Sequence, residues 1–180
     1  MTIFALSTSI VFGQDKNKEV VQRWDAGLSG GIIMYGDVAG FQGMIETRAY
    51  ILDTAFDLNV FVGAGGLFDH AISSQHDMTD IYGYALGGAD WSFFKKEAPL
   101  SLRAQLSLGG GNISDRNSDG TERGSPGFLL VPAIGAEYGF QKLHVNLMVG
   151  YKLMAANDLT LTGATICLGA SYSIFDRNGK

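Results

Sequence analysis

The sequence predicts an all-β protein, an eight-stranded antiparallel up-and-down transmembrane β-barrel. The main observation is an apolar–polar alternation with a period of two, which recurs in runs of roughly ten residues. In one run Leu100, Leu102 and Leu106 share one parity, whereas Arg103 and Gln105 share the other. This period indicates a strand with one apolar and one polar face. A transmembrane barrel requires that pattern in every strand.

The composition supports a barrel and excludes other classes. The 180 residues are enough for one domain with a sizeable core. Charged residues make up 17%, below the average of about 25%, and glycine is abundant at 25 residues. No apolar run reaches the roughly 18 residues of a membrane-spanning helix. The net charge of −5 predicts no nucleic-acid partner, and the single Cys167 excludes an intrachain disulfide.

The first residues are typical of an export signal. Residues 3–12 form a short apolar stretch that ends at Gly13 and is followed by the polar run 14–19. Met1-Thr2 carries no basic residue, so we expect a truncated or misassigned start. An apolar first strand or a disordered arm is the alternative. The expected units are the signal peptide 1–13, a periplasmic segment 14–23, the barrel 24–175 and a C-terminal tail 176–180.

Eight alternating runs predict the strands. In the last run Leu161 breaks the apolar parity, which predicts a bulge near Gly163. Pro132 cannot donate a ladder hydrogen bond, which predicts another irregularity in the sixth run. The predicted strands are 24–35, 44–52, 56–68, 80–93, 100–112, 128–140, 143–154 and 160–175.

The predicted connections alternate in length along most of the chain. The long connections are 36–43, 69–79 and 113–127. The short connections are 53–55, 94–99 and 141–142. The last connection, 155–160, does not follow the alternation. Long loops on one side and tight turns on the other are typical of outer-membrane barrels.

The apolar parity is expected to face lipid rather than an internal cavity. Aromatic residues fall at the strand ends, as in the two interfacial girdles of membrane barrels. The polar parity is rich in Gly, Ser and Asn and carries few charges, unlike a solvated exterior. The expected girdle residues are Trp24, Phe56, Trp91, Phe93, Tyr138 and Phe140 at one rim, and Phe68, Phe128 and Tyr151 at the other.

Charges of both signs occur on the parity assigned to the lumen. Buried charges have to be paired, so we expect a hydrogen-bonded plug rather than an open pore. Each of these residues is expected to satisfy its neighbours rather than to perform chemistry. The predicted lumen network comprises Asp25, Glu46, Arg48, Asp57, Asp90, Arg103, Glu137, His144 and Lys152.

Two segments contain residue types that bind cations. Asp115, Asn117 and Asp119 match the first half of a calcium loop, but position twelve is Pro126 instead of Glu. An Asx-rich surface turn is therefore favoured there. The other segment lacks the spacing of a zinc site and predicts a solvated loop. It contains Asp69, His70, His76, Asp77 and Asp80. We expect no bound metal and no cofactor.

Three segments resemble the small outer-membrane β-barrels of Gram-negative bacteria. They are Tyr35-Gly36-Asp37, 132–138 and the closing 169–175. Over nearly the whole mature chain the sequence is similar to the porin-like, outer-membrane-protein A/X/W-type superfamily. The resemblance implies export to the periplasm, insertion into the outer membrane by the barrel assembly machinery, and contact with outer-membrane lipids and lipopolysaccharide. The family's last strand ends in an aromatic residue; Phe175 matches, although 176–180 follow it.

The predicted function is non-enzymatic, with a structural or surface-interaction role through the long extracellular loops. The sequence does not identify a ligand for these loops. The alternatives are a narrow channel for small solutes, a soluble lipocalin-like ligand-binding barrel, and a lipid-A-modifying enzyme. The enzyme would need a nucleophile beside a base. The nearest pattern, His144-x-Asn146, lacks the nucleophile.

Overall fold

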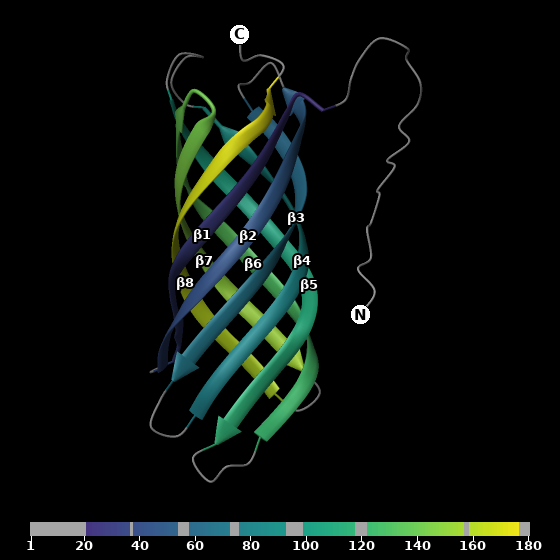
Figure 1. Ribbon diagram of the computed structural model, residues 1–180, viewed down its shortest axis with the longest axis vertical. Helices are drawn as coiled ribbons and strands as arrows, with labels where there is room; N and C mark the ends of the chain where they lie inside the picture. Colours follow the sequence, from purple (N-terminus) through teal and green to yellow (C-terminus); the bar gives the residue numbers. More distant parts are fainter. Residues whose placement is uncertain are drawn as a thin grey trace, which may run out of the picture.

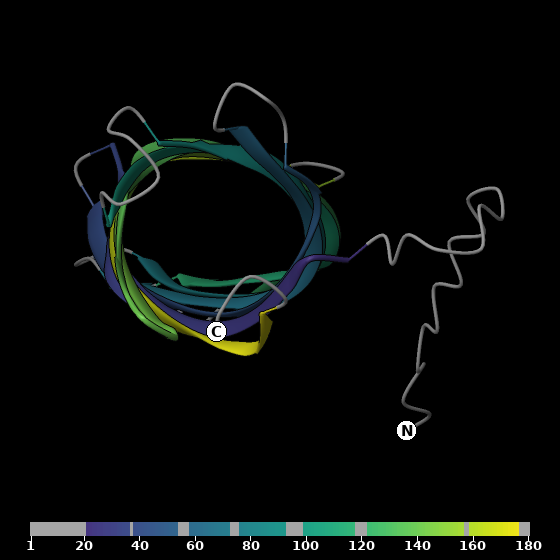
Figure 2. The same cartoon turned by 90° about the horizontal axis from the view of Figure 1, so that it is seen from above.

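The computed structural model describes residues 21–36, 38–53, 58–72, 76–92, 99–117, 122–156 and 159–176. Eight antiparallel strands close into one barrel, as the sequence predicts (Figure 1, Figure 2). The strands are β1 (Arg23–Tyr35), β2 (Val38–Asp53), β3 (Leu58–Ile72), β4 (His76–Trp91), β5 (Leu100–Asn117), β6 (Glu122–Phe140), β7 (Leu143–Ala156) and β8 (Leu159–Asp176). Within these ranges no helix is long and apolar enough to cross a bilayer.

The barrel has two distinct rims. At the proximal rim β1, β3, β5 and β7 begin, and β2, β4, β6 and β8 end (top of Figure 1). At the distal rim the odd-numbered strands end and the even-numbered strands begin. The seam between β1 and β8 is paired from Arg23–Asp176 to Met34–Ala164, so the barrel has no free edge.

Side chains alternate between the lumen and the outside along each strand. On the outside Leu28, Ile134 and Leu168 are 67%, 68% and 62% exposed, whereas Asp25 and Arg103 are buried in the lumen. This distribution is the reverse of that in a water-soluble protein and matches a barrel with an apolar outer band. The lipocalin-like alternative requires the opposite alternation.

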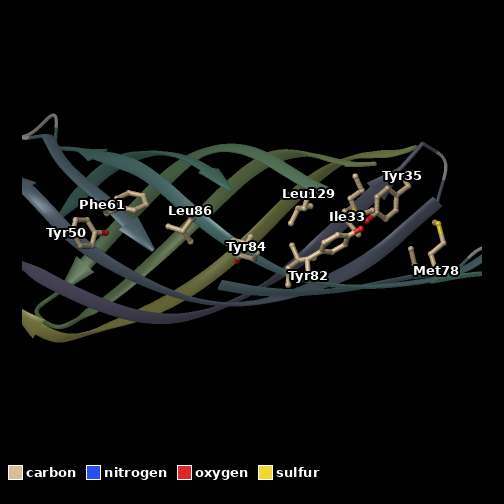
Figure 3. Packing of buried hydrophobic residues seen from close by; sticks show 12 residues of the cluster. Ile33, Tyr35, Tyr50, Phe61, Met78, Tyr82, Tyr84, Leu86 and Leu129 are labelled. Carbon is tan, nitrogen blue, oxygen red and sulfur yellow. The ribbon is translucent and has the colours of Figure 1, made fainter. Parts of the chain in front are cut away.

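The lumen is filled with side chains rather than left open (Figure 3). An eight-stranded barrel leaves only enough interior for side chains to fill. Inward-facing glycines make room for rings: a Cβ at Gly65 would lie 2.6 Å from Cζ of Tyr84, and one at Gly88 2.6 Å from Cζ of Phe61. The buried rings and aliphatic side chains include Ile33, Tyr35, Tyr50, Phe61, Leu67, Tyr82, Tyr84, Leu86, Leu129 and Met154.

The three predicted long loops are wrong, because strand pairing continues through most of each segment. β1 and β2 pair as far as Tyr35–Val38, so only residues 36–37 connect them. Gly36 adopts a φ of 61°, which glycine accepts without steric cost. β3 and β4 pair as far as Ile72–Asp77.

The β5–β6 hairpin shows why the sequence pattern was misleading. It pairs as far as Arg116–Glu122, well inside the predicted loop 113–127. Outward-facing Asn112 and Ser114 interrupt the apolar parity there. A ladder beyond the apolar band has water on its outer face, so its pairing no longer requires apolar side chains. The end of the alternation therefore marks the end of the apolar band, not the end of the strand.

The predicted bulge near Gly163 is wrong. Gly163 pairs with Lys152 in unbroken register. Leu161, whose parity suggested the bulge, is partly buried and packs against the hydrophobic cluster of the lumen. The register shift on β8 instead lies opposite Trp24 and Asp25.

Pro132 interrupts a ladder without shifting it. The β6–β7 pairing stops after Leu130–Leu153 and resumes at Ala133–Gly150 in the same register. The missing N–H of proline accounts for the local gap. The predicted irregularity is therefore a gap in hydrogen bonding and not a bulge.

Candidate functional site

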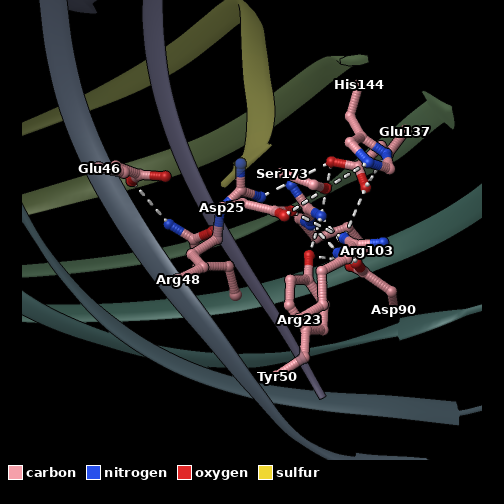
Figure 4. Close-up of polar contacts among 11 residues, drawn as sticks. Arg23, Asp25, Glu46, Arg48, Tyr50, Asp90, Arg103, Glu137, His144 and Ser173 are labelled. Atoms are coloured by element: carbon pink, nitrogen blue, oxygen red, sulfur yellow. Dashed lines mark hydrogen bonds and ion pairs between the residues drawn. The ribbon is translucent and has the colours of Figure 1, made fainter. Parts of the chain in front are cut away.

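The polar residues of the lumen form two clusters, one towards each rim. Both clusters form for the same reason: alternate residues of every strand point into the lumen. The proximal cluster consists of Arg23, Asp25, Arg48, Tyr50, Asp90, Arg103, Glu137, His144 and Ser173 (Figure 4). The distal cluster consists of Tyr35, Asp69, Asp80, Tyr82 and Lys152.

Arg103 joins several acceptors of the proximal cluster. Its Nε donates to Oδ1 of Asp90 at 2.6 Å, and its Nη2 donates to Oδ2 of the same carboxylate at 2.7 Å. Nη2 also donates to the Tyr50 hydroxyl at 2.8 Å and lies 2.7 Å from Oε2 of Glu137. Asp90 and Arg103 are direct partners in the β4–β5 register. The strand register therefore creates this bidentate pair, the strong form of a charge-assisted contact.

Arg23 and Arg48 complete the charge balance of the cluster. Nη2 of Arg23 lies 2.9 Å from Oδ2 of Asp25 and 3.4 Å from Oε1 of Glu137. Its guanidinium stacks 3.9 Å from the centroid of the Tyr50 ring. Nη1 of Arg48 lies 3.7 Å from Oε2 of Glu137. Each buried carboxylate of the cluster thus meets a guanidinium, which offsets the desolvation of both charges.

A serine that the sequence analysis missed lies beside His144. Nε2 of His144 is 3.0 Å from Oγ of Ser173, and Nδ1 is 3.5 Å from Oε1 of Glu137. Ser173 donates its proton to Oδ1 of Asp25 at 2.8 Å. The inward parity of the last predicted strand could have indicated Ser173, but its partner could not be read from the sequence.

This arrangement superficially matches a nucleophile, base and acid. The Asp25 carboxylate is paired with Arg23 and can only accept, so the Ser173 proton is directed to it. Nε2 of His144 therefore faces the serine oxygen and not its proton, whereas a base would face the proton. Ser173 is also 0% exposed. The contact therefore orders the lumen and does not activate a nucleophile.

The distal cluster contains two carboxylates that the sequence analysis assigned to a solvated loop. Asp69 of β3 and Asp80 of β4 are direct register partners, and both are buried in the lumen. Nζ of Lys152 contacts Oδ2 of Asp69 and donates to the Tyr35 hydroxyl at 3.1 Å. That hydroxyl lies 3.1 Å from Oδ2 of Asp69 and 3.3 Å from Oδ2 of Asp80. Lys152 therefore meets a lumen carboxylate, but at the rim opposite the proximal cluster.

The remaining predicted site residues have different positions. Glu46 lies between the two clusters and accepts from the Tyr84 hydroxyl at 2.8 Å and from Gln105 at 3.0 Å. His70 is partly buried on the outward parity, with Nδ1 3.0 Å from Oγ1 of Thr79. In the described part of the chain, no three His, Cys, Asp or Glu side chains converge on a metal-sized site. The positions of Phe56, Asp57, Phe93 and Asp119, and the side chains of His76, Asp115 and Asn117, lie outside the described residues.

The predicted girdle residues that the structure describes all point outward. At the proximal rim they are Trp24, Trp91, Tyr138 and Phe140, and towards the distal rim Phe68, Phe128 and Tyr151. The structure adds Phe41, Tyr172 and Phe175, which are also exposed. Phe41 packs near Phe68 with a ring-centroid distance of 6.1 Å.

The closed antiparallel barrel, its apolar exterior and its charged lumen give this chain the fold of the small eight-stranded barrels of outer membranes. No protein-family model matches the sequence, and no curated protein matches it. Solved structures do match. Neisserial surface protein A is 14% identical, with 84% of this chain and 96% of that chain covered and a TM-score of 0.55.

Two further structures support the same class. Ail, the attachment invasion locus protein of Yersinia pestis, is 16% identical with a TM-score of 0.52, covering 87% of this chain and 100% of that chain. A major outer membrane protein from Thermus thermophilus is 12% identical with a TM-score of 0.57, covering 84% and 98% respectively. The predicted resemblance to small outer-membrane barrels is thus confirmed at the level of the fold.

Proposed function

We propose that this protein is a non-enzymatic barrel of an outer membrane that serves as a rigid scaffold and presents its distal rim for surface contact. The observation that carries the proposal is the apolar outer wall around a plugged, charged lumen. Such a wall is stable in lipid, where every backbone group must be hydrogen-bonded within a closed sheet. The lumen side chains supply stability rather than a path or a reaction.

The plug favours a scaffold over a channel for small solutes. Asp90, Arg103 and Glu137 project from neighbouring strands, and each is at most 3% exposed. Moving any one of them aside would leave a buried charge without its partner, which is costly. A steadily conducting pore requires a continuous water-filled path instead.

The hydrogen-bond directions favour a scaffold over a lipid-modifying enzyme. Ser173 donates its proton to Asp25, so that proton is not directed at His144. Both groups also lie inside the lumen, away from the lipid that such an enzyme would modify. Catalysis on lipid would require a nucleophile that its substrate can reach.

The distal rim is the part available for contact. The β5–β6 hairpin is paired out to Arg116–Glu122, beyond the apolar outer band. Paired strands hold a binding surface with less conformational freedom than an open loop. We therefore assign surface contact to stiff hairpins rather than to the long loops that the sequence suggested.

Cell fractionation with heat-modifiable gel mobility tests the proposal. We expect the protein in the outer-membrane fraction, with a folded form that migrates differently from the boiled chain. We also expect no steady conductance in planar bilayers and an unchanged lipid A mass upon expression. Recovery in the soluble fraction without a mobility shift would overturn the membrane assignment. A lipid A mass change that is lost in His144→Ala would replace the scaffold with an enzyme.

A further inference from the structure

We propose that a groove on the outer wall of the barrel binds one acyl chain of an outer-leaflet lipid, and that it prefers a chain that carries a hydroxyl group. The groove has a volume of about 720 Å³, which lies within the range of binding sites for small ligands. It takes two outward residues from each of the neighbouring strands β4, β5, β6 and β7. This inference rests on the proposed placement of the wall in a membrane.

The groove exists because three neighbouring outward positions on β4 and β5 are small. They are Gly87, Ala89 and Ala104, and the two alanines are direct register partners. Apart from its chain neighbours, a Cβ at Gly87 would meet only the carbonyl oxygen of Phe61, at 3.9 Å, so the space above it is open. The larger side chain of Ile134 also lines the groove. A hollow of this kind offers one acyl chain contacts on more than one side, which a smooth wall does not.

Pro132 leaves a hydrogen-bond acceptor in the same groove. The β5–β6 ladder runs past Pro132 without a break, whereas the β6–β7 ladder lacks the pairs Val131–Lys152 and Pro132–Tyr151. Both pairs depend on donation from the N–H of residue 132 to the carbonyl oxygen of Tyr151, and proline has no N–H. In the described backbone of residues 122–156, this carbonyl therefore has no ladder donor. Pro132 and Tyr151 both line the groove, which thus passes over the acceptor.

The acceptor specifies the chemistry of the chain that suits the groove. A backbone carbonyl without a donor is costly in hydrocarbon. A plain acyl chain cannot donate a hydrogen bond, whereas a hydroxyl on the chain can. Tyr151 belongs to the distal girdle, where the polar ends of outer-leaflet lipids lie in the proposed orientation. A hydroxyl close to the headgroup therefore lies at the depth of the Tyr151 carbonyl.

The shape of the groove favours a lipid over a second copy of the barrel. Two copies in one membrane have the same orientation, so a two-fold axis along the membrane normal would place this hollow against itself. Two facing hollows leave a void, and the atoms that line a void lose their contacts. Of the described residues that line the groove, none is charged, so no ion pair would compensate for this loss. A flexible acyl chain fills the hollow and continues the lipid-facing surface around it.

Native mass spectrometry of the full-length barrel, released from detergent micelles, measures lipid retention. The probes are myristoyl and β-hydroxymyristoyl lysophosphatidylethanolamine, which differ only in the hydroxyl. We expect one retained lipid per barrel and about fivefold stronger retention of the hydroxylated lipid, the effect of one hydrogen bond. Pro132→Ala restores the N–H, so it should abolish this preference while the barrel remains at least as heat-stable as the wild type.

A matched pair of variants tests the groove itself. Ala89→Leu fills it and should remove the retention of both lipids. Ala85→Leu is the control, because Ala85 is also an outward alanine of β4 but does not line the groove, and it should retain both lipids like the wild type.

Three outcomes would overturn the site. The first is equal retention in Ala89→Leu and Ala85→Leu, and the second is an unchanged hydroxyl preference in Pro132→Ala. The third is a dimer that disappears in Ala89→Leu, which would replace the lipid with a second copy. Cell fractionation and heat-modifiable mobility of the wild type test the scaffold separately. A barrel that is found in the outer membrane but retains neither probe contradicts only this inference.

Discussion

At the residue scale, the strand register places some opposite charges directly beside each other. Where it places like charges together, the closed lumen brings a compensating charge from another strand. Asp90 and Arg103 are direct cross-strand partners of opposite sign. Asp69 and Asp80 are direct partners of the same sign, an arrangement that destabilises a sheet by itself. Lys152 reaches across the lumen to Asp69 and compensates for this repulsion. The two aspartates thus depend on a residue of a distant strand.

Arg103→Ala tests the energetic weight of the proximal cluster. We expect the free energy of unfolding to fall by about 3–5 kcal/mol, because Asp90 and Glu137 lose a buried cation. Urea unfolding of the barrel in lipid vesicles measures this change. Ser101→Ala, on the same face of β5, is the control and should lose far less. A loss below about 1 kcal/mol for Arg103→Ala would show that the charges are relaxed by water.

At the element scale, the sequence pattern identified the central part of all eight strands but not their distal ends. Alternation depends on one face meeting lipid, so it stops where the wall leaves the apolar band. Hydrogen bonding continues because it is a property of the backbone. Asn112 and Ser114 therefore belong to β5, although the pattern assigns one to the edge of a strand and the other to a loop.

Inward-facing glycines set how closely neighbouring strands approach. A Cβ at Gly135 would meet the carbonyl oxygen of Leu147 and Sδ of Met148, whereas one at outward-facing Gly43 would meet nothing within 4 Å. We expect Gly135→Ala to destabilise the barrel by at least about 2 kcal/mol through overpacking. Gly43→Ala should be neutral or slightly stabilising. The temperature at which the folded gel form disappears measures both, and equal temperatures would contradict the close approach.

At the scale of the whole molecule, the distribution of side chains is the reverse of that in a water-soluble protein, with an apolar outside and a charged inside. Exposed aromatic residues lie towards both ends of the apolar band, with Trp24 and Phe140 at one end and Phe68 and Phe128 at the other. A tryptophan or tyrosine ring suits the boundary between lipid and water. The band between these rings defines the part of the wall that we place in the bilayer.

Lysine substitutions at two outward positions test this placement. Ile134 lies on β6 between Tyr138 and Phe128, near the middle of the apolar band, and is 68% exposed. We expect Ile134→Lys to cost about 2–4 kcal/mol in lipid vesicles, and Asn112→Lys, beyond the band, to cost about 0–1 kcal/mol. Urea unfolding measures both changes. Similar small losses at both positions would indicate that the outer wall lies in water.

The sequence by itself determined the strand type, the number of strands, the inward or outward parity and most of the buried charges. These properties are local, because a period of two is visible in any short segment. Only the tertiary structure decided which residues meet. Ser173 and Asp25 are separated by 148 positions, and Lys152 and Tyr35 by 117. Closure and register create such contacts, and a shift of one residue would change every one of them, so no local pattern could reveal that Ser173 lies beside His144.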